Sequence, residues 1–423
     1  MKEESIVDKL LKDLQKEKIE KDYSILRLKF NPFPFAGLPR FILPPLDPEI
    51  LRKIGHFISS TWKKEEYSGL TIVGDYGMGK THLMKYIQAI INELTLKARE
   101  HKIDFSAVTC FIDRPENTPQ RVIHKIIEDI ELDNIRKYIW KIVIDNIMAK
   151  KDRFHDQYKS KQSLLLQPKE KWGELFEEPI KSNYLEFLER FRKKGGDIKK
   201  LQEDVRNIIK KEIVSDSALA DRYLNLILFT EEKEADISWD ILAGYVTKRD
   251  VQNKEIIFLN SIVKILRSVG FKHLYVFVDE FEDIGKLSAA KKTNYLLTLT
   301  TLINREARWS VVISLPRSVL EEEIKKEPPL YDRLTSTKIS LRPLDEKKGK
   351  ELLIKYLNLA REKENESVNP FAEDCIKEMI KTSEGNYRSF LLLAYNSIEV
   401  AFEEHKSKID TEIIEKAREL RGI

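Results

Sequence analysis

The stretch Gly74-Asp75-Tyr76-Gly77-Met78-Gly79-Lys80-Thr81 decides the fold of this chain. Its pattern is Gly-x-x-x-x-Gly-Lys-Thr, in which the glycines let backbone N–H groups turn toward a phosphate. An apolar run, Leu70 to Val73, precedes it, and an amphipathic segment starts at His82. This order predicts a strand, a phosphate-binding loop and a helix whose N-terminus adds positive charge. The alternative, a glycine-rich turn without a ligand, is disfavoured because both the spacing and the flanking segments fit.

The side chains of this stretch predict how a nucleotide would be held. Lys80 would reach the β- and γ-phosphates, and the Thr81 hydroxyl would hold Mg²⁺. The residues predicted to bind the nucleotide are Gly74, Asp75, Tyr76, Gly77, Met78, Gly79, Lys80, Thr81 and His82.

A second motif predicts the hydrolytic half of the site. The run Leu274 to Val278 is almost wholly apolar, as expected of a strand buried on both faces, and it ends in Asp279-Glu280. Asp279 would orient Mg²⁺ through its waters, and Glu280 would act as general base toward the attacking water. Two acids after a strand show little alone, but downstream of a phosphate loop they favour a functional role over a structural one.

The remaining strands predict a parallel sheet. Short apolar runs lie at 70–73, 105–112, 274–278, 309–315 and 338–341, with helical segments between them. A strand, a long helix and a strand in this order form a βαβ unit, whose strands are parallel. Ser314 lies at the carboxyl end of the fourth strand, where ligands bind in such sheets. It could contact the γ-phosphate or the water, or it could simply end the strand.

Composition limits the partners. Of the 423 residues 42% are hydrophobic and 34% charged, and the net charge is +4, so no overall basicity indicates nucleic acid.

The run Arg190 to Lys194 is locally basic; a solvated helix end is the default interpretation and a phosphate-backbone contact the alternative. Cys110 and Cys375 are interpreted as small core residues. No membrane-length apolar run and no signal peptide are recognised, so we expect a cytoplasmic protein without a membrane partner.

Changes in pattern along the chain predict five parts. These are an N-terminal helix and proline-rich arm (1–46), the first part of the ATPase core (47–113), a helical insertion (114–250), the second part of the core (251–343) and a C-terminal helical lid (344–423). The charged N-terminal helix is predicted over residues 2–27. In the proline-rich arm, Phe33 and Phe35 would fill either an adenine pocket or an ordinary core.

The order of these motifs resembles the AAA+ ATPases. The tail Glu384-Gly385-Asn386-Tyr387-Arg388-Ser389-Phe390-Leu391 is similar to the sensor 2 element of the origin-recognition/Cdc6-like branch, with Tyr387 where a proline is usual. The resemblance implies that Arg388 reaches the γ-phosphate from the lid. It also places Ser314 at the sensor 1 position, where Asn or Thr is commoner.

The same resemblance implies a homo-oligomer. Tyr331-Asp332-Arg333-Leu334 lies where such proteins carry an arginine finger, which stabilises the transition state in a neighbouring subunit's site, and Arg305 is the second candidate. The long insertion departs from the origin-recognition pattern. Trp239-x-x-Leu242-x-Gly244, followed by a helix and the Asp279-Glu280 strand, resembles ATP-binding proteins of phage-defence systems such as BREX. Thr247-Lys248-Arg249-Asp250 resembles a guanine-reading motif but precedes Asp279, so ATP is preferred over GTP.

The sequence therefore predicts an α/β P-loop NTPase of the AAA+ type: a parallel five-stranded sheet flanked by helices, with a large helical insertion and a C-terminal helical lid. The predicted activity is Mg²⁺-dependent ATP hydrolysis by an oligomeric switch in a DNA-related process, with DNA or a DNA-bound protein as partner. The alternatives are a nucleotide-gated scaffold with little turnover and, less favoured, a small-molecule kinase. The predicted catalytic residues are Glu280, Lys80, Arg333, Arg388 and Ser314, and the predicted metal ligands are Thr81 and Asp279.

Overall fold

The computed structural model describes residues 22–35, 41–64, 67–161, 167–178, 180–228, 254–305 and 309–419. These residues form two compact units. Unit 1 contains the described residues within Met1–Pro48, Gly74–Leu83 and Leu341–Ile423, and unit 2 those within Glu49–Val73 and Met84–Ser340. Most of the predicted N-terminal helix, the Trp239–Gly244 motif and the Thr247–Asp250 motif lie outside the described residues.

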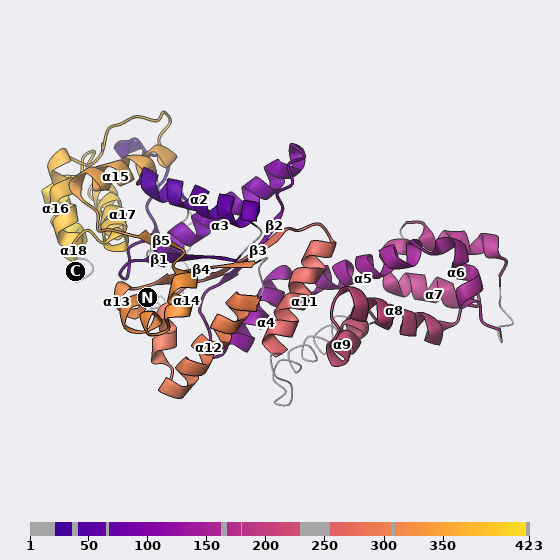
Figure 1. The fold of residues 1–423 in the computed structure, drawn as a ribbon. Helices are drawn as coiled ribbons and strands as arrows, with labels where there is room; N and C mark the ends of the chain where they lie inside the picture. The colour runs from indigo at the N-terminus through magenta and orange to yellow at the C-terminus, as the bar shows by residue number, and fades with distance from the viewer. Residues whose placement is uncertain are drawn as a thin grey trace, which may run out of the picture. The chain divides into compact units, whose positions relative to one another are not determined.

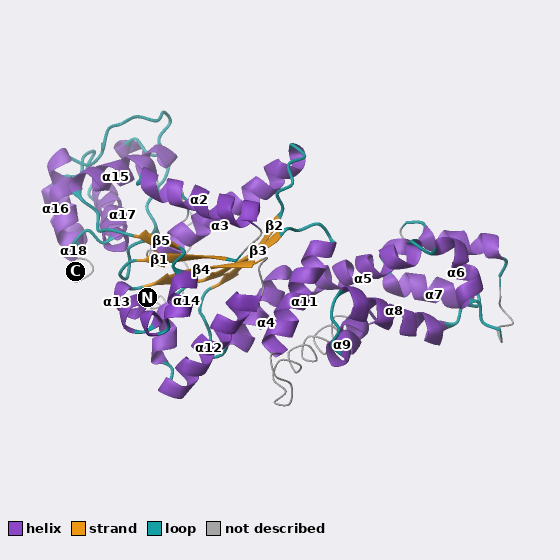
Figure 2. Ribbon diagram, in the orientation of Figure 1, coloured by secondary structure: helices purple, strands orange, loops and turns teal. Residues whose placement is uncertain are grey.

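Unit 2 is built on a five-stranded parallel sheet (Figure 2). Its strands are β1 (Ser68–Val73), β2 (Ala107–Ile112), β3 (His273–Val278), β4 (Trp309–Leu315) and β5 (Thr337–Ser340), arranged in the order β2-β3-β4-β1-β5. Every residue of β3 and β4 is buried, which explains why their sequences are continuous apolar runs rather than alternating ones. The predicted five-stranded parallel sheet is confirmed.

Helices cover both faces of this sheet (Figure 1). On one face lie α2 (Pro48–Lys64) and α3 (Lys80–Glu100); Phe57 of α2 packs edge-on against Tyr275 of β3, with ring centroids 5.9 Å apart. The other face packs against helices that contribute to one hydrophobic cluster with it. These helices are α4 (Pro119–Ile130), α11 (Lys254–Ser268), α12 (Ala289–Arg305) and α14 (Pro328–Leu334). Shorter helices α13 (Arg317–Glu322), η5 (Phe281–Lys286) and η6 (Ile324–Lys326) connect the elements after β3.

The parallel register sets which side chains meet at the carboxyl edge of the sheet. Val73 pairs with Leu315, and Val278 pairs with Ile313. The residues that follow β1 and β3 and the last residues of β4 therefore belong to one edge. The phosphate loop starts at this edge because Gly74 follows Val73 directly.

The described part of the predicted insertion is helical, as expected. After α4 come α5 (Leu132–Met148), α6 (Lys151–Tyr158), η3 (Lys169–Phe176), η4 (Ile180–Ser182), α7 (Tyr184–Lys193), α8 (Ile198–Glu212) and α9 (Ser217–Leu228). Aromatic side chains fill its interior: Phe154, Trp172, Phe187 and Phe191 are almost fully buried and in mutual contact. This interior belongs to the same hydrophobic cluster as the sheet, so the helices are part of one core rather than a separate bundle.

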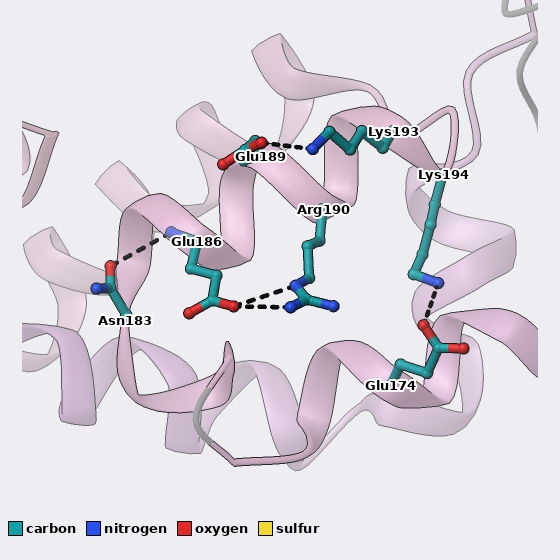
Figure 3. A network of polar contacts seen from close by, with 7 residues as sticks. All are labelled: Glu174, Asn183, Glu186, Glu189, Arg190, Lys193 and Lys194. Atoms are coloured by element: carbon teal, nitrogen blue, oxygen red, sulfur yellow. Dashed lines mark hydrogen bonds and ion pairs between the residues drawn. The ribbon is translucent and has the colours of Figure 1, made fainter.

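The basic run of α7 is paired with acids (Figure 3). Arg190 donates to Glu186 and Lys193 to Glu189, each one helical turn away, whereas Lys194 is buried and donates to Glu174 at 2.9 Å. Phe191 points into the core. These pairings favour the solvated-helix interpretation of the run over a phosphate-backbone contact.

Unit 1 contains the predicted lid. Its helices are α15 (Glu346–Ala360), α16 (Glu373–Ser383), α17 (Tyr387–Glu403) and α18 (Thr411–Glu419). The residues before the phosphate loop pack onto them: Phe33 is fully buried and lies 5.5 Å from the Tyr356 ring centroid. Phe33 is thus a core residue of the lid, one of the two predicted outcomes, whereas Phe35 is 61% exposed, contrary to the prediction that it is buried.

In residues 22–27, the described part of the predicted N-terminal segment, the predicted α-helix is absent. The described part contains only a short 3-10 helix, η1 (Tyr23–Leu26), closed by Arg27 in a left-handed conformation. The side chain of Asp22 caps this helix by accepting from the Ser24 N–H, so the chain turns where the sequence pattern suggested continuation. No helix in the described part of the chain is long and apolar enough to cross a bilayer.

Candidate nucleotide-binding site

The loop between β1 and α3 has the backbone that an anion cradle needs. Gly77 and Gly79 adopt φ angles of 78° and 86°, a left-handed region that side-chain-bearing residues rarely enter. A Cβ atom at Gly79 would meet nothing within 4 Å, so this glycine is required for its backbone angle rather than for lack of space. Alternating left- and right-handed residues before a helix N-terminus point successive N–H groups into one concavity.

Lys80 places a buried positive charge on this loop. Its side chain is largely buried, and Nζ donates to the carbonyl oxygens of Gly74 at 2.9 Å and Asp75 at 3.3 Å. These partners are neutral, so the ammonium charge is not neutralised by them and remains available to an anion. Thr81 follows in the first turn of α3 and is exposed. A polyphosphate therefore fits the donors of this loop.

His82, predicted to bind the nucleotide, contacts the preceding segment of unit 1. Its Nε2 atom lies 3.2 Å from the Leu43 nitrogen and 2.9 Å from the Leu43 oxygen. The imidazole thus ties the chain before the phosphate loop to the start of α3. Sequence patterns gave no sign of this contact, because Leu43 lies in an irregular proline-rich stretch.

The start of lid helix α17 contacts the phosphate loop within unit 1. Asn386 Nδ2 donates to the Tyr76 carbonyl at 2.6 Å, and the Arg388 N–H donates to the Gly77 carbonyl at 3.0 Å. A Cβ atom at Gly77 would lie 2.4 Å from Asn386 Oδ1, so only glycine permits this approach. The sensor 2 residues predicted from the sequence are therefore placed directly on the loop.

Tyr387 occupies the position where the sensor 2 pattern usually has proline. Burial, with the nearby charges of Asp345 and Asp47, raises the pKa of the Tyr387 hydroxyl to about 12. The phenol therefore stays neutral at physiological pH and serves as a packing residue at the first position of α17.

Asp279 is held in place at the carboxyl edge of the sheet in unit 2. It is 5% exposed; its N–H donates to the Ile112 carbonyl at 2.9 Å, and its Oδ1 accepts from the Glu280 N–H and from the Ser314 hydroxyl. Ser314 is fully buried. The geometry of Ser314 suits a residue that orients the Asp279 carboxylate. Oxygen atoms are the ligands Mg²⁺ prefers, so the Asp279 carboxylate has suitable chemistry for the ion.

Glu280 has an unusual backbone. Its φ of 45° puts a non-glycine residue in the left-handed region, which costs on the order of 1 kcal/mol and tends to mark functional positions. Its side chain is about half exposed. An exposed carboxylate next to the buried Asp279 is accessible to water, as a general base must be.

Arg114 is a residue of this edge that sequence analysis missed. Its Nε lies 3.0 Å from Glu280 Oε2 and 3.9 Å from Asp283 Oδ2. Ile112, the last residue of β2, pairs with Val278, the last residue of β3. Arg114 and Glu280 are each the second residue after these paired ends. The Arg114–Glu280 contact could be inferred from the sequence only if the pairing of β2 with β3 were already known.

Arg333 lies at the opposite end of β1. Its carbonyl oxygen would be 2.3 Å from a Cβ atom on Gly69, and its positive charge acts on the buried Tyr67 hydroxyl. From Gly69 to Val73 the strand rises about 13 Å, so the exposed Arg333 is far from the edge where the phosphate loop begins. Arg305 ends α12, and its side chain lies outside the described part of the structure.

Solved structures and curated proteins give remote matches. The Aeropyrum pernix ORC2 protein in its ADPNP-ADP complexes is 12% identical, covering 90% of this chain and 70% of that one with a TM-score of 0.47. The A. pernix ORC1 protein in complex with DNA is 12% identical, covering 93% and 69%, with a TM-score of 0.45. Pyrobaculum aerophilum Cdc6p is 11% identical, covering 94% and 70%, with a TM-score of 0.40.

An uncharacterized HTH-type transcriptional regulator of Methanocaldococcus jannaschii is 22% identical over 148 residues, and the match spans 35% of this chain and 35% of that relative. A family model gives a much more extensive match. The model described as BREX system ATP-binding protein BrxC/D matches residues 63–393, a range that includes the phosphate loop, the Asp279-Glu280 pair and Arg388. The chain belongs to this BrxC/D family of BREX system ATP-binding proteins, and its phosphate loop follows the first strand of a five-stranded parallel sheet.

Proposed function

We propose that this protein is an Mg²⁺-dependent ATPase that acts as an oligomeric switch in a DNA-related process, phage defence being the process that the family description favours. One observation carries the hydrolytic part of the proposal. Asp279 is buried and hydrogen-bonded at the end of β3, and the next residue, Glu280, presents an exposed carboxylate at the same edge of the sheet from which the phosphate loop starts.

Each residue has a distinct role in this proposal. The loop N–H groups and Lys80 bind the polyphosphate, and Thr81 with Asp279 would hold Mg²⁺, which supplies charge neutralisation when bound. Glu280 accepts the proton of the attacking water. Ser314 keeps the Asp279 carboxylate in one orientation. Arg388 would sense the γ-phosphate from the lid.

The position of Arg333 supports the proposed oligomer. An exposed arginine at the amino end of β1 is well placed to act on a neighbouring copy rather than on its own phosphate loop. An arginine supplied in trans neutralises charge that develops in the transition state. The DNA-related role is supported by the BREX description of the family and by the transcriptional-regulator name of the curated relative.

Turnover and binding of ATP test the proposal. We expect the protein to hydrolyse ATP in the presence of Mg²⁺, and duplex DNA to raise the rate. Lys80→Ala should abolish nucleotide binding, whereas Glu280→Gln should retain binding and lose turnover by two or more orders of magnitude. Thr301→Ala, a change on the exposed surface of α12, is the control and should match the parent protein. Normal turnover by Glu280→Gln would show that another group is the base.

A second function, a nucleotide-gated scaffold with slow turnover, is favoured by one observation. The Arg114–Glu280 ion pair holds the carboxylate of the candidate base against a cation at 3.0 Å, which leaves this carboxylate less available to a water molecule. In this case ATP would stabilise one conformation, and the helices of residues 114–228 would dock a partner. ATP binding with a rate that stays negligible with and without DNA would favour the scaffold over the ATPase.

A further inference from the structure

Tyr76 has no role in the chemistry of a phosphate loop. It occupies one of the four variable positions of the motif, where the backbone rather than the side chain contacts the ligand. Its side chain nevertheless stands out from the loop, and the residue is 72% exposed. Exposure of a single aromatic residue is ordinary in itself, so the contacts of Tyr76 decide its interpretation.

Arg388 lies against the Tyr76 side chain through two kinds of contact. Its guanidinium carbon is 5.4 Å from the centre of the tyrosine ring, within the range of a cation–π interaction, and its Nη1 donates to the tyrosine hydroxyl. Both contacts belong to unit 1, so they do not depend on the placement of the sheet. The cation that the proposed function assigns to the γ-phosphate is thus engaged by a residue of the phosphate loop itself.

Backbone contacts beside this pair hold the start of α17 on the loop, so the Arg388 side chain can move without movement of the lid. Asn386 donates to the Tyr76 carbonyl and also caps α17 by accepting from the Ser389 N–H at 3.1 Å. The Arg388 N–H donates to the Gly77 carbonyl. These bonds can persist while the Arg388 side chain, with its four rotatable bonds, moves elsewhere.

The same bonds define the side of the loop on which Arg388 is anchored. In a planar peptide the carbonyl and the N–H of the bond point in opposite directions. The Tyr76 and Gly77 carbonyls face the start of α17, whereas a phosphate is bound by loop N–H groups. To reach a γ-phosphate, the guanidinium has to leave the Tyr76 ring.

We propose that Tyr76 is a positioning residue that holds Arg388 when no γ-phosphate is present and thereby lowers the preference of the protein for ATP over ADP. The inference rests on the proposed role of Arg388 toward the γ-phosphate. ADP leaves the Tyr76–Arg388 contact intact, whereas ATP has to break it, so only the affinity for ATP includes this cost. An exposed cation–π contact corresponds to about a two- to fivefold change in a dissociation constant.

The first experiment compares the affinities of the full-length protein and its variants for the β,γ-imido analogue of ATP and for ADP, with Mg²⁺ present. Tyr76→Ala should bind the analogue about two- to fivefold more tightly and ADP unchanged. Tyr76→Phe keeps the ring and should give a smaller gain. Equal changes for both ligands, or weaker binding of the analogue, would show that Tyr76 supports the loop in general and would overturn the proposal.

The second experiment asks whether Tyr76 acts through Arg388. In an Arg388→Ala background, Tyr76→Ala should no longer alter the affinity for the analogue, because the interaction is already absent. A gain of the same size in this background would contradict the proposal. Because Tyr76 is exposed, neither Tyr76 variant should alter the melting temperature appreciably.

The third experiment needs no nucleotide and so distinguishes failure of the inference from failure of the proposed function. The tyrosine ring should shift the Arg388 Nε–Hε proton resonance upfield in the nucleotide-free protein, and Tyr76→Ala should remove this shift. If the resonance is the same in the parent protein and in Tyr76→Ala, the Tyr76–Arg388 contact is absent in solution and the inference fails, whatever the protein binds. A shifted resonance in a protein that binds neither nucleotide would refute the proposed function instead, because the contact would then have no ATP to oppose.

Discussion

Glu280 combines two features that bear on its reactivity. Its backbone is left-handed, and Arg114 meets its carboxylate at 3.0 Å. The arginine is 65% exposed at its side chain, so the pair is screened by water and its strength is modest. An ion pair of modest strength can hold the Glu280 carboxylate in place and still break when the carboxylate has to contact a water molecule.

Replacing Arg114 tests this restraint. Arg114→Ala should raise kcat for ATP hydrolysis by up to about fivefold, since the carboxylate is no longer held by the arginine and the lost pair contributes about 1 kcal/mol. Steady-state kinetics at saturating ATP would measure it. Arg121→Ala is a matched control, because Arg121 is similarly exposed and pairs with Glu116 instead. A fall in kcat for Arg114→Ala would mean that Arg114 assists the reaction.

His273 makes the stability of unit 2 depend on pH. It is buried at the start of β3, its Nε2 lies 2.9 Å from Ser310 Oγ, and burial lowers its pKa from 6.5 to about 3. In the folded state the ring stays neutral, while the unfolded chain takes up a proton below pH 6.5. Stability should therefore fall as the pH drops from 6.5 toward 3, by roughly 1.4 kcal/mol per pH unit from this group.

Urea unfolding at pH 6.5 and 5.0 measures this dependence. His273→Gln keeps a hydrogen-bonding side chain without the titration, and its stability should change less between the two pH values than that of the parent protein. His405→Gln removes an exposed histidine and should leave the dependence unaltered. If His273→Gln retains the full pH dependence, another group causes it.

Among the elements, strands and the phosphate loop were predictable because their sequences obey local constraints. Strands buried on both faces need continuous apolar runs, and the observed limits of β1, β3, β4 and β5 lie within two residues of the predicted ones. The loop is constrained by its two left-handed glycines and by the lysine and threonine that follow. The strands at residues 274–278 and 309–315 could be predicted from their own sequences, without knowledge of the rest of the chain.

Contacts between elements distant in sequence were not predictable in this way. The Arg114–Glu280 pair depends on the register of β2 with β3, and the Arg388–Tyr76 contact joins residues more than 300 positions apart. Phe33 and Phe35 are chemically identical and two residues apart in an irregular segment, so no periodicity indicates that one is buried and the other exposed. Sequence reasoning therefore named candidate residues of the site and missed these contacts between residues.

In the helices of residues 114–228, Lys193 at the end of α7 and Lys194 directly after it offer a matched test of packing against surface charge. Lys194 is buried and bonded to Glu174, whereas Lys193 is 70% exposed and pairs with Glu189 (Figure 3). Lys194→Ala should lower Tm by about 2–4 °C, because it removes a buried stem as well as a hydrogen bond. Lys193→Ala should leave Tm within about 1 °C. Equal decreases in Tm for Lys194→Ala and Lys193→Ala, measured by calorimetry, would show that burial of Lys194 does not contribute to stability.

At the scale of the whole molecule, the proposed oligomer makes two inactive variants complementary. Lys80→Ala lacks a working phosphate loop but keeps Arg333, which lies at the amino end of β1. Arg333→Ala keeps the loop but lacks the candidate finger. If the finger acts in trans, mixed oligomers contain some sites with an intact loop beside an intact arginine, so a mixture should hydrolyse ATP although each variant alone does not.

This complementation can be measured by titrating Lys80→Ala into a fixed amount of Arg333→Ala and following phosphate release. We expect the rate to rise from the level of Arg333→Ala alone and to reach a plateau when every intact loop has a Lys80→Ala neighbour. A protein carrying both substitutions, titrated in the same way, is the control and should give no rise, because it brings neither a loop nor an arginine. Normal hydrolysis by Arg333→Ala alone would exclude Arg333 as the finger. An inactive Arg333→Ala that Lys80→Ala fails to rescue would place the arginine's action within its own subunit, since a residue acting in cis cannot be supplied by a partner.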